Sequence, residues 1–219
     1  MARAVKKPRR YDASRRREAA QETRRAIVEA ARRLFLERGY TGTTMAAIAS
    51  AAGVSHETVY ASFGPKPALF RHLVEIALSG TDFPVPGLER DYARQVRAET
   101  DPGRLFDIYA RAMRLTQERL APLFDVLSDG ARTDPDLKAL SDELSGRRVG
   151  HMRLLAAHLA EIGALRDGVS VEAAADVIWL MNSSEVFLML VRDRHWDPDF
   201  FERWLAESWK LLLTPQSPP

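Results

Sequence analysis

The sequence predicts an all-α protein, and three observations support this fold class. Apolar residues recur at three- and four-residue intervals along most of the chain, which is the spacing of one buried helix face. No segment shows the strict alternation of apolar and polar residues that is typical of a half-buried strand. Capping residues and Asp-Pro pairs precede the periodic segments. A capping side chain accepts a hydrogen bond from a free backbone N–H group at the start of a helix, and a proline at the first helical position has no N–H group that needs a partner. We expect about nine or ten helices, with a three-helix head followed by a larger helical domain.

The head begins with an amphipathic helix from Thr23 to Gly39, whose buried stripe consists of Ile27, Ala30, Ala31, Leu34 and Phe35. Thr44 is a good N-cap for a second, short helix that ends at Gly53. Ser55 then caps a third helix of about two turns that reaches Ser62. Gly64-Pro65 stops this helix, and a fourth one is predicted from Lys66 to Leu78.

A loop over residues 79–87 separates the head from the rest of the chain. Three Asp-Pro pairs open helices near 102–119, 135–162 and 198–213, and Ser170 opens another that continues to about Asp193. A short helix near 88–98 and a turn near 122–131 complete the expected elements. The predicted organisation is a flexible basic arm over residues 1–20, a head over 21–80, a helical domain over 88–213 and a frayed tail over 214–219.

Composition excludes several classes of function. The 219 residues contain no cysteine, so disulfide scaffolds, thiol catalysis and iron–sulfur clusters are excluded. No signal peptide is visible, and the most apolar run, 177–191, is too short and too polar to span a bilayer, so we expect a cytoplasmic protein without membrane association. Residues 1–70 hold 14 Lys/Arg and 6 Asp/Glu, whereas the remainder holds 18 and 24. This asymmetry indicates that the N-terminal part meets a polyanion, although a merely solvated basic tail is the alternative.

Residues 44–63 have the spacing of a helix-turn-helix, in which Gly53 makes the turn and Val54 and Val59 fill the junction. The second helix of such a motif enters the major groove of DNA, where base edges distinguish all four base pairs. Its exposed residues would include His56, Thr58 and Tyr60. Glu57 either accepts a hydrogen bond from a cytosine or caps the helix N-terminus, and its early position favours capping.

The region from Arg24 to Phe70 resembles the TetR family of bacterial transcriptional regulators. The matching residues stand in order and include Ile27, Ala30, Leu34, Phe35, Gly39, Tyr40, Thr44, Ile48, Ala49, Gly53, Val54, Ser55, Thr58, Val59, Tyr60, Phe63, Lys66, Leu69 and Phe70. The resemblance implies that DNA is contacted by Thr44, Ser55, Thr58, Tyr60 and the phosphate-binding Lys66. Further candidate DNA contacts are Arg24, Thr43, His56, Glu57 and Ser62. The basic arm, with Arg15 and Arg16, is expected to add phosphate or minor-groove contacts. Glu57, Ser62 and Pro67 depart from the common family pattern, which weakens the expected backbone contact of Ser62 in particular.

For residues 88–213 the resemblance implies a buried ligand pocket and dimerisation through the last two long helices. Candidate pocket residues are Phe106, Tyr109, Met113, Met152, Trp179, Asn182, Glu185 and Phe187, although such residues at helical spacing are usually core. The polar residues from Asn182 to Glu185 interrupt an apolar helix and need partners, which are a ligand or other side chains. The expected homodimer interface contains Val171, Ile178, Leu190, Phe201, Trp204, Leu205 and Leu212; the alternative is that these residues only complete the core of one chain.

His151, His158 and Glu161 share one helix, but their spacing matches no recognised metal site, and solvated or core side chains are expected instead. No sequence motif for catalysis is present, so an enzyme is the minor hypothesis, and we expect no metal and no cofactor. The resemblance to the TetR family therefore implies a transcriptional regulator that binds double-stranded operator DNA as a homodimer and responds to an apolar small molecule. Repression is the expected sign; activation, or a helical interaction module without DNA binding, is the alternative.

Overall fold

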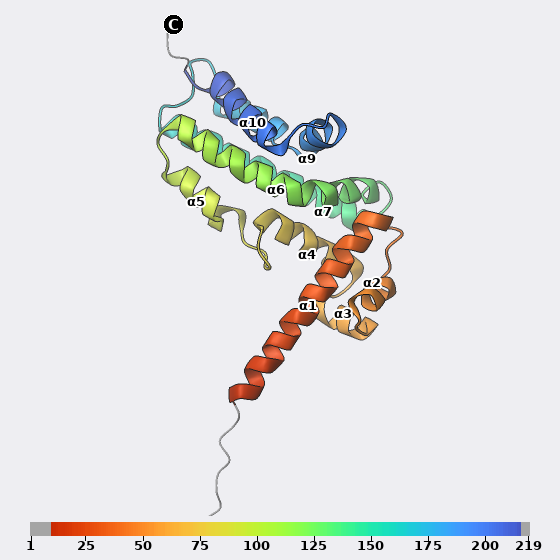
Figure 1. The fold of residues 1–219 in the computed structure, drawn as a ribbon. Helices are drawn as coiled ribbons and strands as arrows, with labels where there is room; N and C mark the ends of the chain where they lie inside the picture. Colours follow the sequence, from red (N-terminus) through yellow and green to blue (C-terminus); the bar gives the residue numbers. More distant parts are fainter. Residues whose placement is uncertain (1–9, 216–219) are drawn as a thin grey trace, which may run out of the picture. The chain divides into compact units, whose positions relative to one another are not determined.

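The computed structural model of the chain describes residues 10–215, and the side chains of residues 15–215. Within this part of the chain there are ten α-helices, two short helical segments of other types and no strand (Figure 1). The prediction of an all-α fold is confirmed. Contacts divide the chain into two compact units, Met1–Phe70 and Arg71–Pro219. The division falls inside one continuous helix, which spans Lys66–Ser79.

The first unit contains α1 (Arg10–Arg38), α2 (Met45–Ala52), α3 (His56–Phe63) and the start of α4 (Lys66–Ser79). Its core is closed by three rings: Phe35 stacks on Tyr40 with centroids 5.6 Å apart, and Phe70 meets both edge-on. Three apolar side chains are fully buried, one from each helix: Ile27 of α1, Ile48 of α2 and Val59 of α3. These are the apolar positions that the helical spacing predicted.

The first helix begins at Arg10 and not at Thr23, as the apolar stripe had suggested. Residues 10–20 are therefore helical, and only residues 1–9 of the expected arm lie outside the described residues. The apolar stripe could not reveal this extension because residues 15–22 are all exposed. Arg, Ala, Glu and Gln are good helix formers, and adding turns to an existing helix costs far less than starting one.

The second unit contains η1 (Gly87–Glu89), α5 (Asp91–Ala98), α6 (Pro102–Gly130), α7 (Pro135–Glu161), α8 (Val171–Met181), α9 (Ser184–Phe187), η2 (Leu188–Asp193) and α10 (Pro198–Leu213). Each Asp-Pro pair opens a helix, as predicted. The carboxylates of Asp101, Asp134 and Asp197 accept hydrogen bonds from backbone N–H groups in the first turn, and the following proline takes the first helical position.

Two predicted boundaries in this unit are wrong. A single helix, α6, covers the segment in which a helix and a separate turn were expected, and it runs through Pro122. Its buried stripe continues past the proline with Leu123 and Leu127, and burial of this stripe outweighs the cost of about 3 kcal/mol for an internal proline. Conversely, the helix expected from Ser170 to Asp193 breaks at Asn182 and Ser183, and the two halves are bent by 43°.

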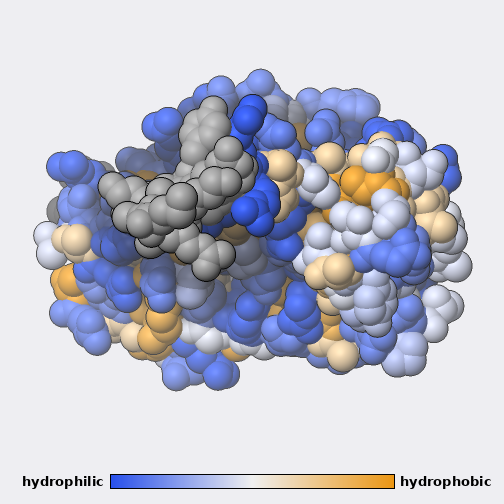
Figure 2. Space-filling model, turned by 90° about the horizontal axis from the view of Figure 1, so that it is seen from below, coloured by the Kyte–Doolittle hydropathy of each residue, from blue (hydrophilic) through white to orange (hydrophobic). Residues whose placement is uncertain are grey.

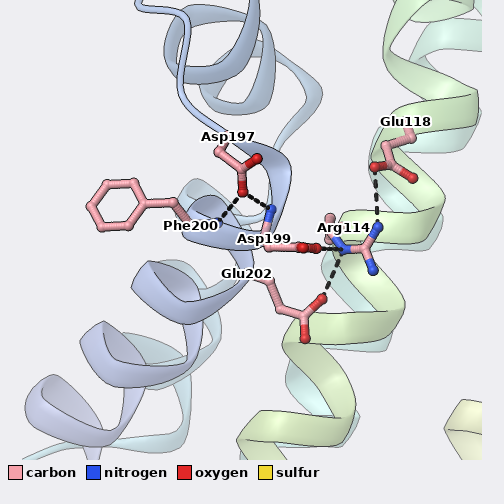
Figure 3. A network of polar contacts seen from close by, with 6 residues as sticks. All are labelled: Arg114, Glu118, Asp197, Asp199, Phe200 and Glu202. Carbon is pink, nitrogen blue, oxygen red and sulfur yellow. Dashed lines mark hydrogen bonds and ion pairs between the residues drawn. The ribbon is translucent and has the colours of Figure 1, made fainter.

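An extensive packing contact in the second unit joins α6 to α10. Trp209 is fully buried between the rings of Phe106 and Tyr109, whose centroids lie 5.9 and 5.3 Å from it. At the edge of this contact, Arg114 Nε donates to Glu202 at 2.8 Å and Nη1 donates to Glu118 at 3.1 Å (Figure 3). These bonds raise the pKa of Arg114, with the bond to Glu202 as the largest cause. The network fixes the register of α10 against α6.

No single helix among the described residues is long and apolar enough to cross a membrane, although the bent pair Val171–Met181 and Ser184–Asp193 passes by length and composition. Within this pair Ala174, Ala175, Ile178 and Phe187 are buried in the core of the second unit. The face shown in Figure 2 is mainly hydrophilic, with small separate hydrophobic patches.

Candidate functional site

The helix-turn-helix has the capping pattern that the sequence predicted. The Thr44 hydroxyl accepts from the N–H of Ala47 at 3.1 Å, and the Ser55 hydroxyl accepts from the N–H of Thr58 at 3.2 Å. Gly53 ends α2 with φ +66°, a left-handed conformation that costs glycine least. The Val54 N–H then donates back to the Ala49 carbonyl at 3.0 Å, which closes the turn.

The third helix presents one buried and one exposed face. Val59 is completely buried, whereas His56, Glu57, Tyr60 and Ala61 are exposed. Tyr60 keeps 55% of its surface exposed. Thr58 and Ser62 are half-buried. A helix of this kind can offer an imidazole and a phenol to a partner while remaining anchored by its inner face.

The carboxylate of Glu57 is held at the N-terminus of its own helix. The backbone N–H of Glu57, and after it the Ser55 hydroxyl, keep the pKa of this carboxyl below its usual range. Helix N-termini stabilise negative charge, so this arrangement favours the capping interpretation over hydrogen bonding to cytosine.

Thr43 was expected to contact DNA, and for its side chain this expectation is wrong. The residue is completely buried, and its hydroxyl donates to the carbonyls of Leu34 at 3.0 Å and Gly39 at 2.8 Å. Leu34 lies near the C-terminal end of α1, and Gly39 directly follows its last residue, Arg38. Thr43 therefore closes α1 and positions Thr44, and it has no side-chain surface for a partner.

Two of the expected phosphate contacts are engaged inside the first unit. Arg24 Nη1 donates to the Ser62 carbonyl at 2.6 Å, and its guanidinium lies 4.2 Å from the centre of the Phe63 ring. Lys66 Nζ donates to the carbonyls of Tyr40 at 2.9 Å and Thr43 at 3.0 Å. Arg24 thus fixes the end of α3, and Lys66 fixes the loop before α2.

Arg15 and Arg16 have exposed side chains on the part of α1 that precedes its buried stripe. Arg25 and Arg33 are also exposed farther along the helix. The surplus of basic residues in the first 70 positions is therefore partly displayed on an ordered helix. Exposed guanidinium groups of this kind suit a phosphate backbone.

The second unit contains a partly open cavity of about 1270 Å³. Six of the eight residues expected in a pocket line it: Tyr109, Met113, Met152, Trp179, Asn182 and Glu185. Phe106 and Phe187 do not, because Phe106 packs on Trp209 and Phe187 packs edge-on against Phe201, 5.1 Å between centroids. Both are core residues.

Polar groups converge on the wall of the cavity where α8 breaks. Asn182 Nδ2 donates to the Tyr109 hydroxyl at 2.9 Å, and that hydroxyl donates to Met152 Sδ at 3.3 Å. Burial raises the pKa of Tyr109, so its hydroxyl keeps its proton. Ser184 is also paired, because its hydroxyl donates to Gln117 Oε1 at 2.8 Å. The amide nitrogen of Asn182 and the hydroxyl of Ser184 therefore have partners inside the chain, and both residues line the cavity.

Sequence reasoning missed several residues of this wall, notably Arg148, Gln117 and Gly87. Arg148 stands one helical turn before Met152, a residue that was expected in the pocket, so helical spacing could have indicated it. Gly87 could not have been found in this way. Its backbone lies against the His151 ring so closely that a Cβ there would collide with Cε1, and this contact joins segments distant in sequence.

His151 and His158 do not form a metal site with Glu161. His158 Nε2 lies 3.0 Å from the Glu99 carbonyl, and His151 faces the cavity beside Gly87. Burial, with the charges of Arg90 and Arg147, lowers the pKa of His151. No group of three or more His, Cys, Asp or Glu residues that could hold a metal ion is found in the described part of the chain.

Three residues expected at a dimer interface lie inside the single chain instead. Ile178, Phe201 and Leu205 are completely buried, so they cannot contact a second copy. Leu212 is 40% exposed, while Val171, Leu190 and Trp204 are half-buried.

The outward face of α10 carries three large apolar side chains: Phe200, Trp204 and Leu211. Their spacing of four and seven residues places them on the face opposite the buried residues of this helix. Figure 3 shows the Phe200 ring directed away from α6.

Comparison with known proteins agrees with this architecture. Residues 27–73 match the family described as "Bacterial regulatory proteins, tetR family". The chain is 32% identical over 111 residues to the HTH-type transcriptional regulator AcrR of Shigella flexneri, a match that covers 49% of each chain. It thus spans about half the length of that relative.

The match to the HTH-type transcriptional repressor AcnR of Corynebacterium efficiens is longer, with 30% identity over 152 residues, 68% of this chain and 72% of AcnR. Among solved structures, NalD, the secondary repressor of the MexAB-OprM multidrug efflux pump in Pseudomonas aeruginosa, superposes with a TM-score of 0.68 at 26% identity, covering 89% of this chain and 98% of NalD. The chain belongs to the TetR family of bacterial regulatory proteins.

Proposed function

We propose that this protein is a transcriptional repressor that binds a pseudo-palindromic operator as a homodimer and is released from it by a small molecule. The observation that carries the proposal is the exposed face of α3, held by two capped helix ends in the part of the chain with surplus positive charge. AcnR and NalD are both named repressors, which supports repression over activation.

The proposed recognition surface is smaller than the set expected from the sequence. His56 and Tyr60 are the candidates for base edges in the major groove, since Glu57 is engaged at the helix N-terminus. Thr44 and Ser55 stand at helix N-termini, where backbone N–H groups and hydroxyls suit phosphates. Half-buried Thr58 and Ser62 are proposed to contact the edge of the same surface.

Arg15 and Arg16 are proposed to add phosphate contacts from the N-terminal part of α1. For Lys66 and Arg24 we propose an indirect role, because their cationic groups already donate to backbone carbonyls of the first unit. They would preserve the angle between α2, α3 and α4, on which the fit to the groove depends.

The proposed dimer forms through the outward face of α10, with Phe200, Trp204 and Leu211, together with Leu180 of α8 and Met189 of η2. These side chains are between 44% and 60% exposed apart from Trp204, which is half-buried. A two-fold axis along this face would bury them against their own copies, which is the usual geometry of a homodimer. A dimer would also present two α3 helices to two half-sites.

The cavity of the second unit is the proposed effector site. Val74 and Leu78 of α4 line it, and the same helix begins at Lys66 in the first unit. A ligand that shifts α4 would therefore alter the spacing of the two heads. By linkage, DNA and ligand would weaken each other's binding by the same factor.

The test is a mobility-shift titration of the purified protein with duplex from its own upstream region and with random duplex as competitor. We expect binding that survives competitor, and a loss of about tenfold or more for Tyr60→Ala. Arg153→Ala, an exposed arginine of α7, serves as the matched control and should bind as the wild type does. Equal displacement by random and specific duplex would reject operator recognition.

A further inference from the structure

Arg148 and Trp179 form a charged corner of the cavity. The Arg148 guanidinium, on α7, lies 4.5 Å from the centre of the Trp179 ring on α8, and both residues line the cavity. Arg148 is half-buried and makes no ion pair with any residue that the structure describes. Burial lowers the pKa of Arg148, and the opposing attraction of Glu185 does not offset it. A partly desolvated cation without a close anion is costly, and a bound anion would relieve that cost.

Two further polar atoms, on residues that line the same cavity, are buried without a hydrogen-bond partner among the described residues. They are Trp179 Nε1, an N–H donor, and Asn182 Oδ1, an acceptor. Asn182 is only 2% exposed, and its amide nitrogen is already fixed by Tyr109. Buried polar groups in native proteins nearly always have a partner. Within the described part of the chain, the corner thus combines a cation that has no ion pair with a donor and an acceptor that have no hydrogen-bond partner.

The other charges around the cavity are satisfied or hydrated. Glu75 pairs with Arg147 at 2.7 Å, Arg90 donates to the Val85 carbonyl at 3.2 Å, and Arg97 donates to the Leu88 carbonyl at 2.7 Å. Glu89, Glu161 and Glu185 are exposed to water. A cationic ligand would therefore meet carboxylates that are already solvated, whereas an anionic one would meet Arg148.

We propose that the effector is an apolar molecule carrying one anionic group, a carboxylate or a sulfonate, which pairs with Arg148 and accepts from Trp179 Nε1. Its apolar body lies along Leu78, Leu120, Phe124 and Leu155, and a donor group on it reaches Asn182 Oδ1. The cavity of about 1270 Å³ accommodates a drug-sized molecule. This inference rests on the proposed function, because it assigns the ligand class of the proposed effector site.

The test compares two fluorescent probes that differ only in charge: 8-anilinonaphthalene-1-sulfonate and its uncharged parent, N-phenyl-1-naphthylamine. Both are titrated into the full-length protein at constant ionic strength. We expect the sulfonate to bind about tenfold more tightly than the uncharged probe, because a charge-assisted hydrogen bond in a partly buried site increases affinity by about this factor. Equal affinities, or tighter binding of the uncharged probe, would overturn the proposal.

Variants locate the effect at Arg148. In Arg148→Met the preference for the sulfonate should disappear while the affinity for the uncharged probe stays within about twofold, and in Arg148→Lys part of the preference should return. The matched control is Arg153→Met, an exposed arginine of the same helix outside the cavity, which should behave as the wild type does. A preference that persists in Arg148→Met, with thermal unfolding showing a folded protein, would assign the anion to another site and overturn the proposal.

The ligand class and the proposed function can fail separately. If the charge preference depends on Arg148 but the protein binds no duplex, the anion site is supported and the repressor function is rejected. If the protein binds its operator but shows no charge preference, the repressor function is supported and the anionic effector is rejected. Release of operator DNA by the sulfonate, and not by the uncharged probe at equal occupancy, is the result expected if both are right.

Discussion

Gln117 Nε2 on α6 donates a hydrogen bond of 2.6 Å to the backbone carbonyl of Asn182, the residue at which α8 ends. The two residues are 65 positions apart in sequence. On the other side of the break, the Ser184 hydroxyl donates to Gln117 Oε1 at 2.8 Å. One buried amide thus satisfies a carbonyl that the interrupted helix cannot pair and a hydroxyl that the next helix brings into the core.

Replacing this amide should be costly. Gln117→Leu leaves the Asn182 carbonyl and the Ser184 hydroxyl buried without their partner, so we expect the free energy of unfolding to fall by about 2–4 kcal/mol. Urea unfolding followed by circular dichroism measures it. Gln95→Leu, at an exposed position of α5, should change stability by less than about 0.5 kcal/mol. A Gln117→Leu protein as stable as the control would mean that the break is held by other contacts.

The salt dependence of DNA binding tests the basic part of α1. Each phosphate contact contributes about 0.9 to the slope of log affinity against log salt concentration. If Arg15 and Arg16 both lie on phosphates, the double variant Arg15→Ala/Arg16→Ala should lower the slope by about 2. Mobility-shift titrations at four salt concentrations give the slope. An unchanged slope would assign these side chains to solvent.

Lys66 should behave differently from a phosphate-binding lysine. Its ammonium lies 4.0 Å from the centre of the Tyr40 ring and donates to two carbonyls of the loop before α2. Lys66→Met should therefore lower the free energy of unfolding by about 1–2 kcal/mol and leave the salt slope of DNA binding unchanged. A stable variant whose slope falls by about 1 would restore the direct phosphate contact that the family resemblance implied.

The two faces of α10 should respond in opposite ways to a charge. Leu211→Glu places a carboxylate on the 60% exposed outward face, where it should give a folded monomer that binds operator poorly. Leu205→Glu places it in the core and should prevent folding. Light scattering after size exclusion gives the mass of each, and circular dichroism gives its folding. A Leu211→Glu protein that remains dimeric would move the interface to other residues.

The sequence predicted those features that depend on neighbouring residues. Capping by Thr44, Ser55 and the three Asp-Pro pairs is local, and so is the helical spacing that buries Ile27 and Val59. For the same reason the exposed face of α3 could be read from residue spacing alone.

The features that were missed depend on contacts between distant segments. The break at Asn182 needs Gln117, and the burial of Thr43 needs the end of α1 to fold over it. Phe201 and Leu205 were placed at an interface because an apolar helix does not reveal which of its faces meets its own chain. Helical spacing from Met152 could have placed Arg148 in the cavity wall, but its contact with the Trp179 ring forms only when α7 and α8 pack together.

His151 makes stability depend on pH. Burial, with Arg90 and Arg147 nearby, lowers its pKa below the ordinary value of 6.5 in the folded protein. Between the two pKa values the unfolded chain binds a proton that the folded one does not, so stability rises with pH in this window and is lost as pH falls below 6.5. Urea unfolding at pH 7.5 and pH 5.5 should therefore show a less stable wild type at the lower pH.

His151→Gln should reduce this loss, because glutamine cannot take up a proton, whereas His56→Gln, at an exposed position of α3, should retain it. For each variant, the free energy of unfolding at pH 5.5 is subtracted from that at pH 7.5, which removes any effect of the substitution on packing that does not depend on pH. Were His151→Gln to lose as much stability as the wild type on acidification, the pH dependence would have to arise from other groups, and the His151 ring would tolerate its proton beside Gly87.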